Sequence, residues 1–586
     1  MSFGGRALLS EIASAGEEGE SGERTRWVRP AALACVLIAY VWLQWAGLGH
    51  PLFWQDEGET AMLGQRVLEY GYPKVHGDTG VVYGVGVPMS EAVDPETDAY
   101  LGSFWGQYYL AAVGVSLGEG MDDPYRRTAW VRAPFLLCGL IGLGLLWWAV
   151  QPAFSGRRGA GLDSALVFGV LLCLSVSLML HLREARYYGP TLGLVGAAVA
   201  LEFRVWRAGH ARSPGSTLGF GTLSFGVLLL LVNFFFPAAV AVAGWWAGER
   251  LWRLFRNPGE ASSLFQRGWP LGLVLVLWAL VSFILMQAFG LSRTAGILSE
   301  RWGFGFGLYL ENLGHLVFFL ARYEWLIPCL LAEIGLRIWA KPISSGSGPE
   351  EGLLDTRLAL YRLCLVYGAV GAANPIFFER YFVPLGPILA LVLALDLEVL
   401  RRRIARVEPV SERRRGEWVA LLSVAVVLLT LVWIRAPEVG GRVAEIRDPV
   451  EGPVDAGVLF VSSRWADPSD LTLATNYEME PFMFYLGSRV VGRFHPGTAE
   501  EEAAESAVRP DLVIPRMAQP RSLFAVRRYL LDGEFKRHEL SVADTGYNNI
   551  PELYPGRVLS TVHHFKTQHA GASAPPLAIY ERLDGP

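Results

Sequence analysis

Long apolar runs alternate with short polar loops along most of this chain. An α-helix needs about 20 apolar residues to cross a lipid bilayer, and several runs reach that length. The pattern predicts about eleven membrane-spanning helices, within a range of 10 to 13. The predicted spans are residues 31–48, 129–150, 163–181, 189–203, 217–233, 237–248, 269–289, 323–340, 358–374, 381–399 and 417–435. The chain is therefore predicted to be a mainly α, polytopic membrane helical bundle.

The charge of the loops predicts which side of the membrane each loop faces. Lys and Arg are concentrated in loops at alternate ends of the spans, and loops of this kind face the cytoplasm. The N-terminus is then expected in the cytoplasm and the C-terminus outside, in a plasma membrane such as a bacterial inner membrane. The basic segments are RTRWVRP, SGRRG, EFRVWRAGHAR, ERLWRLFRN, RIWAK and RRRIARVEPVSERRR.

Two further apolar stretches, residues 104–118 and 304–321, are short or interrupted by polar residues. We expect both to form interfacial or re-entrant helices on the outer side. No small-residue cleavage pattern follows the first apolar run, which indicates an uncleaved signal anchor. The expected parts of the chain are a cytoplasmic tail (1–30), a transmembrane domain (31–435) with a long outer loop (49–128), and an extracytoplasmic α/β domain (436–586).

The residues after 436 alternate between short β-type and helical patterns. Such alternation favours a small, parallel-type sheet. The predicted strands are 457–463, 471–475, 489–494, 510–515 and 576–583, with a helix at 476–487. No GxGxxG or P-loop motif is present, so the sequence gives no support for nucleotide binding.

Composition agrees with a membrane protein and excludes some other classes. Hydrophobic residues make up 52% of the chain and charged residues 18%. The net charge of −5 gives no indication of nucleic-acid binding. All five cysteines lie in apolar runs, without the spacing of a zinc site or a disulfide framework, and are expected to be small hydrophobic side chains.

The first candidate site is the acidic pair Asp56-Glu57, directly after the first predicted span. A carboxylate near the membrane plane is costly to bury and is often functional. The alternative is a solvated loop start or the acidic first turn of the helix predicted at 58–71. The same loop continues with Lys74, His76 and Asp78.

The second candidate is LREARYYGP, with Arg183, Glu184, Arg186 and Tyr187. Two arginines three residues apart would share a helix face and could bind a phosphate. Anchoring at the membrane interface is the alternative, although arginines at an outer end are contrary to the usual charge bias.

The third candidate is FFERYFVPLGP, with Glu379, Arg380 and Tyr381 at the start of a late span. An interface anchor with an intrahelical ion pair is again the alternative. Aromatic residues also gather on the predicted outer side and could stack on sugars or pack on lipid: Trp105, Tyr108, Tyr109, Phe234, Phe235 and Phe236.

Taken in order, these motifs resemble the GT-C superfamily of membrane glycosyltransferases. The most similar branch contains the protein O-mannosyltransferases and the aminoarabinose lipid A transferase. That branch has an Asp-Glu pair opening the first outer loop, an Arg-x-Tyr element after a later span and an Arg-Tyr-x-x-Pro element opening a late span. Here these elements correspond to Asp56-Glu57, to Arg186-Tyr187, and to Arg380-Tyr381 with Pro384. The resemblance covers roughly residues 30 to 400.

The resemblance implies an inverting transfer of a hexosyl or pentosyl group from a polyprenyl-phosphate donor. The acceptor would be a hydroxyl or phosphate of a lipid, glycan or protein in the cell envelope, so protein glycosylation is included. Asp56 would act as general base with Glu57 beside it. Arg186 and Arg380, with Arg183 and Lys74 in reserve, would bind the donor phosphate, and the pocket would include Tyr187, Tyr381, Glu184 and Glu379.

The sequence departs from the family pattern at two places, which limits the residue roles that the resemblance implies. The usual Lys-Pro-Pro-Leu element is absent, and DPETDAYLGSFWGQYY stands in its place, where Glu96 or Asp98 could substitute. No cofactor is certain and a divalent metal ion stays open, with His76, Asp78 and Glu96 as weak candidate ligands. The WWDYG-type signature of oligosaccharyltransferases is missing, which disfavours N-glycosylation by that route.

Three rival classes remain at this point. Another lipid-linked glycan transferase or ligase would share the multi-span core. A transporter would usually show charges within spans and paired repeats, whereas the charges here cluster at one face. A non-catalytic scaffold would use the C-terminal domain and would tolerate the loss of Asp56.

Overall fold

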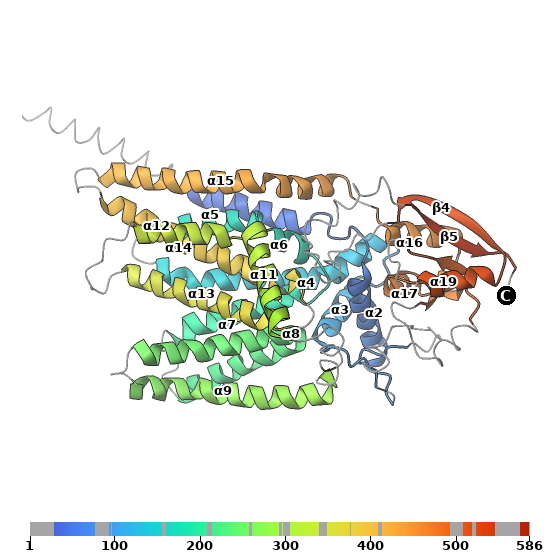
Figure 1. Cartoon of the computed structure of the whole chain (residues 1–586), viewed down its shortest axis with the longest axis horizontal. Helices are drawn as coiled ribbons and strands as arrows, with labels where there is room; N and C mark the ends of the chain where they lie inside the picture. The colour runs from blue at the N-terminus through green and yellow to red at the C-terminus, as the bar shows by residue number, and fades with distance from the viewer. Residues whose placement is uncertain are drawn as a thin grey trace, which may run out of the picture.

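The computed structural model describes most of the chain. The described residues are 28–76, 93–94, 96–154, 160–207, 214–256, 261–291, 296, 305–338, 349–374, 377–407, 413–449, 451–492, 508–517, 523–544 and 575–584. The molecule is elongated, with a helical bundle at one end and a small β-sheet domain at the other (Figure 1). The helices α2 and α3 lie between these two parts.

The bundle is built from helices that run roughly along the long axis of the molecule (Figure 1). They are the helix Val28–Trp45, α4 (Pro124–Val150), α5 (Ala160–Cys173), α7 (Tyr188–Leu201), α8 (Pro214–Arg256), α9 (Ala261–Ala288), α12 (Leu326–Ile338), α13 (Pro349–Ala372), α14 (Leu385–Val407) and α15 (Arg413–Arg447). Short elements continue three of them: η1 (Gln151–Phe154) after α4, α6 (Val176–His181) after α5 and the π-helical η2 (Glu202–Trp206) after α7.

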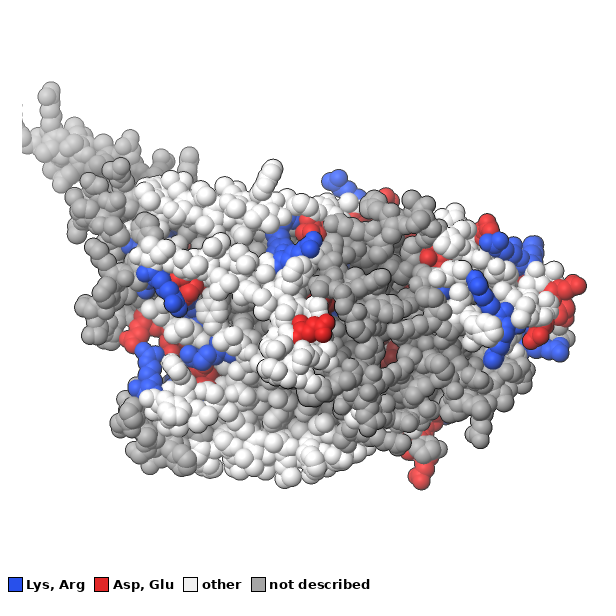
Figure 2. All heavy atoms as spheres, in the orientation of Figure 1, with Lys and Arg blue, Asp and Glu red and all other residues white. Residues whose placement is uncertain are grey.

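Five of the described helices are long and apolar enough to cross a membrane. They are Val28–Trp45, Pro124–Phe154, Gly215–Arg256, Trp269–Ala288 and Trp418–Arg447. On the face shown in Figure 2, uncharged surface covers most of the bundle, and charged side chains gather near its far end and over the sheet domain. An uncharged surface of this kind is what contact with the lipid bilayer requires. The polytopic helical fold is confirmed, while the number of eleven spans stays a prediction.

The helix α8 is not continuous. Phe235 interrupts it with φ −154° and ψ 95°, and Pro237 follows two residues later. Arg250 and Arg253, near the end of α8, both bind Glu202 of η2, although it is the start of α8 that is close to η2 in sequence. The two arms of α8 therefore run in opposite directions, as the separate predictions 217–233 and 237–248 required.

Three helices belong to the end of the bundle that faces the sheet domain. The helix α2 (Gln55–Tyr70) packs against α3 (Gly106–Leu117), and α3 packs against α4. The helix α11 (Phe306–Tyr323) runs across the bundle axis in Figure 1. The stretches 104–118 and 304–321, for which we expected non-spanning helices, correspond to α3 and α11.

The sheet domain holds five strands in the order β2-β1-β3-β5-β4. The strands are β1 (Thr472–Thr475), β2 (Arg489–Val491), β3 (Leu512–Ile514), β4 (Phe535–Ala543) and β5 (Pro576–Arg582). The pairs of β1 with β2 and β3 are parallel, and those of β5 with β3 and β4 are antiparallel. The sheet is therefore mixed, and β4 has no counterpart among the predicted strands. The helical elements of the domain are α16 (Pro453–Arg464), η6 (Pro468–Asp470), α17 (Met479–Leu486), α19 (Leu523–Arg527) and η7 (Arg528–Leu531).

The predicted strand 457–463 was wrong, because this segment belongs to helix α16. Val454, Val458 and Val461 are its buried apolar side chains, and their spacing of four and three residues is that of one helix face. A short apolar run cannot be assigned by its periodicity alone. The expected boundary at residue 436 falls within α15, which continues to Arg447.

Candidate active site

The Asp56 carboxylate lies where three distant segments of the chain meet. Asp56 is in the first turn of α2, and its Oδ2 is 3.1 Å from Nη2 of Arg380 and 3.5 Å from Nη2 of Arg186. Arg186 precedes α7, and Arg380 lies in the 3₁₀-helix η4 (Glu379–Phe382) that precedes α14. The structure therefore joins one predicted carboxylate to two predicted cations. The side chain of Asp56 keeps 24% of its surface exposed, so a ligand can reach it.

The two arginines carry more donor groups than the described residues satisfy. Arg186 donates from Nη1 to the Asp56 carbonyl and to Thr60 Oγ1, each at 3.0 Å. Within the described part of the chain, Arg186 Nε and the Nε and Nη1 of Arg380 are buried without a hydrogen-bond partner. A buried guanidinium with unused N–H groups is costly unless an anion completes it. Asp56 is the carboxylate that contacts both guanidinium groups directly. Two positive charges against one negative charge allow the site to bind a further anionic group.

Aromatic rings form a wall next to these charges. Tyr187 and Phe235 stack at 5.0 Å between centroids, with 8° between their planes, and Tyr381 lies 5.1 Å from Phe235. Phe235 is the residue that breaks α8, so the break delivers this ring to the site. The Arg380 guanidinium lies over the rings of Phe378 and Trp54, at 4.3 and 5.1 Å. Such rings restrict the guanidinium and shield it from water.

Glu57 points away from Asp56 into the protein interior. Arg132 of α4 binds both of its carboxylate oxygens, Nε to Oε1 at 2.8 Å and Nη2 to Oε2 at 2.6 Å. The backbone N–H of Ala185 also donates to Glu57 Oε1, at 2.7 Å. Glu57 thus ties α2 to α4 and to the turn that carries Arg186. Arg132 was missing from the sequence prediction, and its only signal was a charge close to the start of a predicted span.

The prediction that Arg183 and Arg186 share a helix face was wrong. Residues 182–187 form a turn between α6 and α7, so the two side chains diverge. Arg183 donates to the carbonyl of Gly47 at 2.6 Å and lies 3.6 Å from Glu445 of α15. It supports the end of the first helix and does not contact Asp56.

The other predicted site residues lie at varying distances from Asp56. Lys74 follows the far end of α2 and lies over the Tyr70 ring, roughly 20 Å along the helix from Asp56. Glu184 is buried beside His181, at 3.1 Å. Glu379 precedes Arg380 in sequence and is buried. Burial raises the pKa of Glu379 to about 7, while a backbone hydrogen bond and the charge of Arg380 act to lower it.

Glu59 lies about one helix turn from Asp56 in α2 and was not among the candidate residues of the sequence analysis. Tyr108 of α3 donates to Glu59 Oε1 at 3.1 Å. Burial raises the pKa of Glu59, Arg186 opposes the rise and Asp56 adds to it. Glu59 therefore belongs to the same electrostatic environment as Asp56 and Arg186, which residue spacing alone could not indicate.

The candidate metal ligands gather only in part. His76 Nδ1 lies 2.7 Å from Asp98 Oδ1, and Glu96 is exposed. Asp78 lies outside the described residues. In the part of the chain that the structure describes, no three His, Cys, Asp or Glu side chains gather to hold a metal ion.

Comparisons with known proteins place the fold. No family model matches the chain, and no curated protein matches it. ArnT from Cupriavidus metallidurans bound to undecaprenyl phosphate superposes with a TM-score of 0.51 and 14% identity, over 91% of this chain and 100% of that one. The apo state of that protein gives 0.47 and 14%, over 88% and 96%. The Archaeoglobus fulgidus oligosaccharyltransferase with zinc and sulfate gives 0.47 and 12%, over 85% and 69%.

The observed fold, a membrane helical bundle with a small sheet domain, agrees with the fold that the sequence resemblance predicted. In particular, the chain has an ArnT-like fold over nearly its whole length.

Proposed function

We propose that this protein transfers a sugar from a polyprenyl-phosphate donor to an acceptor hydroxyl or phosphate at the outer face of the membrane. The observation that carries the proposal is the contact of Asp56 with two arginines whose buried N–H groups are partly unused. The ArnT-like fold supports it, because ArnT was solved with undecaprenyl phosphate bound. The acceptor is a lipid, glycan or protein of the cell envelope.

Arg186 and Arg380 are the proposed phosphate ligands. When the sugar leaves its carrier, the bond from the anomeric carbon to the phosphate oxygen breaks and both electrons stay on that oxygen. The phosphate then carries more negative charge than in the donor. Guanidinium groups already aimed at this position stabilise the added charge without reorganising.

Asp56 is the proposed general base. The acceptor oxygen attacks the anomeric carbon from the side opposite the phosphate, which inverts the configuration, and its proton passes to the Asp56 carboxylate. General-base assistance of this kind contributes roughly 10²- to 10⁴-fold in rate. The Asp56 carboxylate contacts the Nη2 groups of the two arginines, so the unused N–H groups of Arg186 and Arg380 are left for the donor phosphate and the carboxylate stays available to the acceptor.

The rest of the site serves this arrangement. Tyr187, Phe235 and Tyr381 form the aromatic side of the donor pocket, and Glu57 fixes the position of α2 through Arg132. The orientation follows from the loop charges, which put the N-terminus in the cytoplasm and the sheet domain outside. The acceptor then approaches from the side of the sheet domain.

The test is sugar transfer by the purified full-length protein from polyprenyl-phosphate donors. Asp56→Asn is expected to lower kcat by about 10²-fold or more, whereas Glu69→Gln, on the exposed side of the same helix, leaves it unchanged. Arg380→Gln is expected to slow transfer and weaken binding of undecaprenyl phosphate, and the exposed Arg126→Gln serves as its control. Wild-type turnover in a folded Asp56→Asn variant excludes Asp56 as the base.

A further inference from the structure

The start of α2 is held from the sheet domain, more than 400 residues away along the chain. The Leu52 N–H donates to Asp455 Oδ1 of α16 at 3.1 Å, and the Phe53 N–H donates to the Tyr485 hydroxyl at 3.1 Å. The side-chain amide of Gln55 donates to Glu480. These three bonds hold the segment of the chain that immediately precedes Asp56.

Close packing adds to these hydrogen bonds. A Cβ atom built on Gly58 would lie 2.4 Å from Pro481 Cδ, so only glycine allows α2 and α17 to approach this closely. The Phe53 ring lies 5.4 Å from that of Phe484 and 5.5 Å from that of Tyr485. The first turn of α2 therefore has α17 directly against it, on both sides of Asp56 in sequence.

The helix does not fix its own start. Its N-cap residue Trp54 provides no side-chain hydrogen bond, although the first N–H groups of a helix need partners. Tyr485 also lies 2.5 Å from Thr128 Oγ1 of α4, so one hydroxyl group connects the sheet domain to both helices. Glu480 and Asp455 are almost completely buried, which makes their bonds costly to replace with water.

We propose that α17 is a positioning element for Asp56, with Glu480 and Tyr485 as the positioning residues. The inference rests on the proposed function, in which Asp56 removes the acceptor proton. A base must lie within hydrogen-bond reach of that proton, and the hold of α17 on residues 52–58 sets where the carboxylate lies relative to Arg186 and Arg380. The sheet domain then contributes to catalysis by positioning Asp56, in addition to lying on the side from which the acceptor approaches.

The experiment combines two measurements on the full-length protein. Hydrogen exchange of the backbone amides in residues 52–60 reports whether α17 holds α2, and it needs no substrate. Steady-state kinetics with a polyprenyl-phosphate sugar report whether that hold matters for turnover. The variants are Tyr485→Phe, which removes only the hydroxyl group, and Glu480→Ala, alone and combined.

The controls separate positioning from general damage. Glu480→Gln retains an oxygen that can accept from Gln55 and is expected to stay close to wild type. Tyr580→Phe, in β5 and away from α2, removes a hydroxyl from the same domain without touching the contact. Thermal unfolding of each variant identifies any loss of folded protein.

The combined variant is expected to exchange faster in residues 52–60 and to lose about 10- to 100-fold in kcat, with the donor KM unchanged. Wild-type exchange in this segment overturns the proposal, and so does faster exchange with wild-type kcat. A wild-type protein that transfers no sugar overturns the proposed function instead, and the exchange rates still show whether α17 holds α2.

Discussion

At the end of the bundle that faces the sheet domain, residues that are adjacent in sequence have different roles. Asp56 and Glu57 are adjacent, yet one contacts Arg186 and Arg380 and the other is enclosed by Arg132 and the Ala185 N–H. Successive helix residues point about 100° apart, so one of the two faces the site while the other faces the interior. An acidic pair in a sequence is therefore not one functional unit.

Removing Arg132 should leave Glu57 as an uncompensated buried charge. Arg132→Ala is expected to reduce the free energy of unfolding by about 3–5 kcal/mol. Thermal or denaturant unfolding in detergent measures the loss. Arg126→Ala is the control, because its side chain is 79% exposed and its ion pair with Asp123 lies in water. Adding Glu57→Leu to the Arg132 variant should recover part of the stability, and no recovery would contradict the role of the buried charge.

Glu379 should make stability depend on pH. Burial raises the pKa of Glu379 to about 7 in the folded protein, from about 4.5 for a glutamate in water. The folded state then binds more protons than the unfolded state between these values, so the free energy of unfolding falls as pH rises from about 4.5 to 7. The fall attributable to this group is at most roughly 3 kcal/mol.

The measurement compares unfolding at pH 5 and pH 8 for the wild type and for Glu379→Gln. The variant is expected to lose less stability over this interval, because its amide does not ionise. Glu119→Gln, at an exposed position, should behave like the wild type. An equal pH dependence in Glu379→Gln and wild type would show that Glu379 ionises as it does in water.

At the scale of elements, glycines set how closely the helices approach. A Cβ atom on Gly142 of α4 would lie 2.6 Å from the Leu192 carbonyl oxygen of α7, and one on Gly189 would lie 2.2 Å from the Phe135 carbonyl oxygen. Small residues at such crossings let the backbones of membrane helices come into contact. The contact between α4 and α7 matters for the site, because Arg186 and Tyr187 directly precede α7.

Gly142→Ala should therefore push α7 away from α4. The expected result is a lower unfolding temperature and slower sugar transfer, because the turn before α7 moves relative to Asp56. Gly144→Ala is a matched control on the same helix, since a Cβ atom there meets nothing within 4 Å among the described residues. It should be neutral or more stable by up to about 1 kcal/mol. Equal behaviour of the two variants would contradict the close-packing argument.

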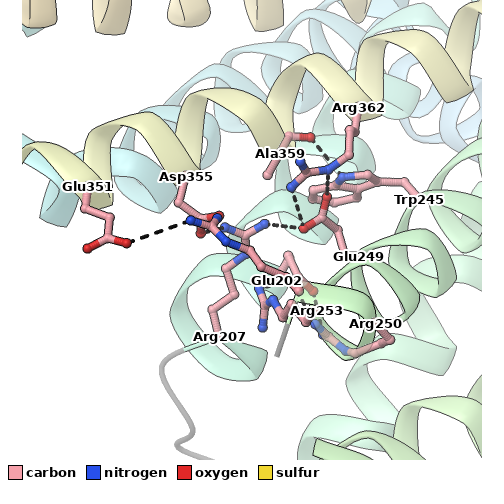
Figure 3. A network of polar contacts seen from close by, with 11 residues as sticks. Glu202, Arg207, Trp245, Glu249, Arg250, Arg253, Glu351, Asp355, Ala359 and Arg362 are labelled. Atoms are coloured by element: carbon pink, nitrogen blue, oxygen red, sulfur yellow. Dashed lines mark hydrogen bonds and ion pairs between the residues drawn. The ribbon is translucent and has the colours of Figure 1, made fainter. Parts of the chain in front are cut away.

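At the scale of the whole molecule, the site and a buried ion network occupy opposite ends of α7. Figure 3 shows this network, in which Glu202 contacts Arg207, Arg250 and Arg253. Glu249 of α8 contacts Arg207, which follows η2, and Arg362 of α13. The network joins η2, α8 and α13 roughly 20 Å from the turn that carries Arg186.

Glu202→Ala should weaken the bundle without changing the chemistry. The carboxylate is fully buried, so its loss leaves three arginines partly unpaired and is expected to cost about 3–5 kcal/mol in unfolding free energy. The kcat and donor KM of the folded protein should stay at wild-type values. Glu351→Ala is the control, since that side chain is 63% exposed and its ion pair with Arg256 is 3.8 Å long. A changed donor KM in Glu202→Ala would contradict the separation of the two ends.

The sequence by itself determined the helical class and the presence of a small sheet after the last predicted span. That 104–118 and 304–321 form helices that do not span the membrane stays a prediction. Length, apolar periodicity and charge are local properties, and a bilayer turns them directly into helices. It also marked Asp56, Arg186 and Arg380 as candidates, because charges at the end of an apolar run are costly and stand out.

Only the tertiary structure decided which of these charges meet. Contacts between residues 56, 186 and 380 depend on how helices pack, and no local pattern encodes them. The same holds for Arg132 beneath Glu57, for Arg183 turning to Gly47, and for α17 lying against the start of α2. Helix 453–464 was misjudged for the related reason that a short apolar run takes its conformation from what it packs against.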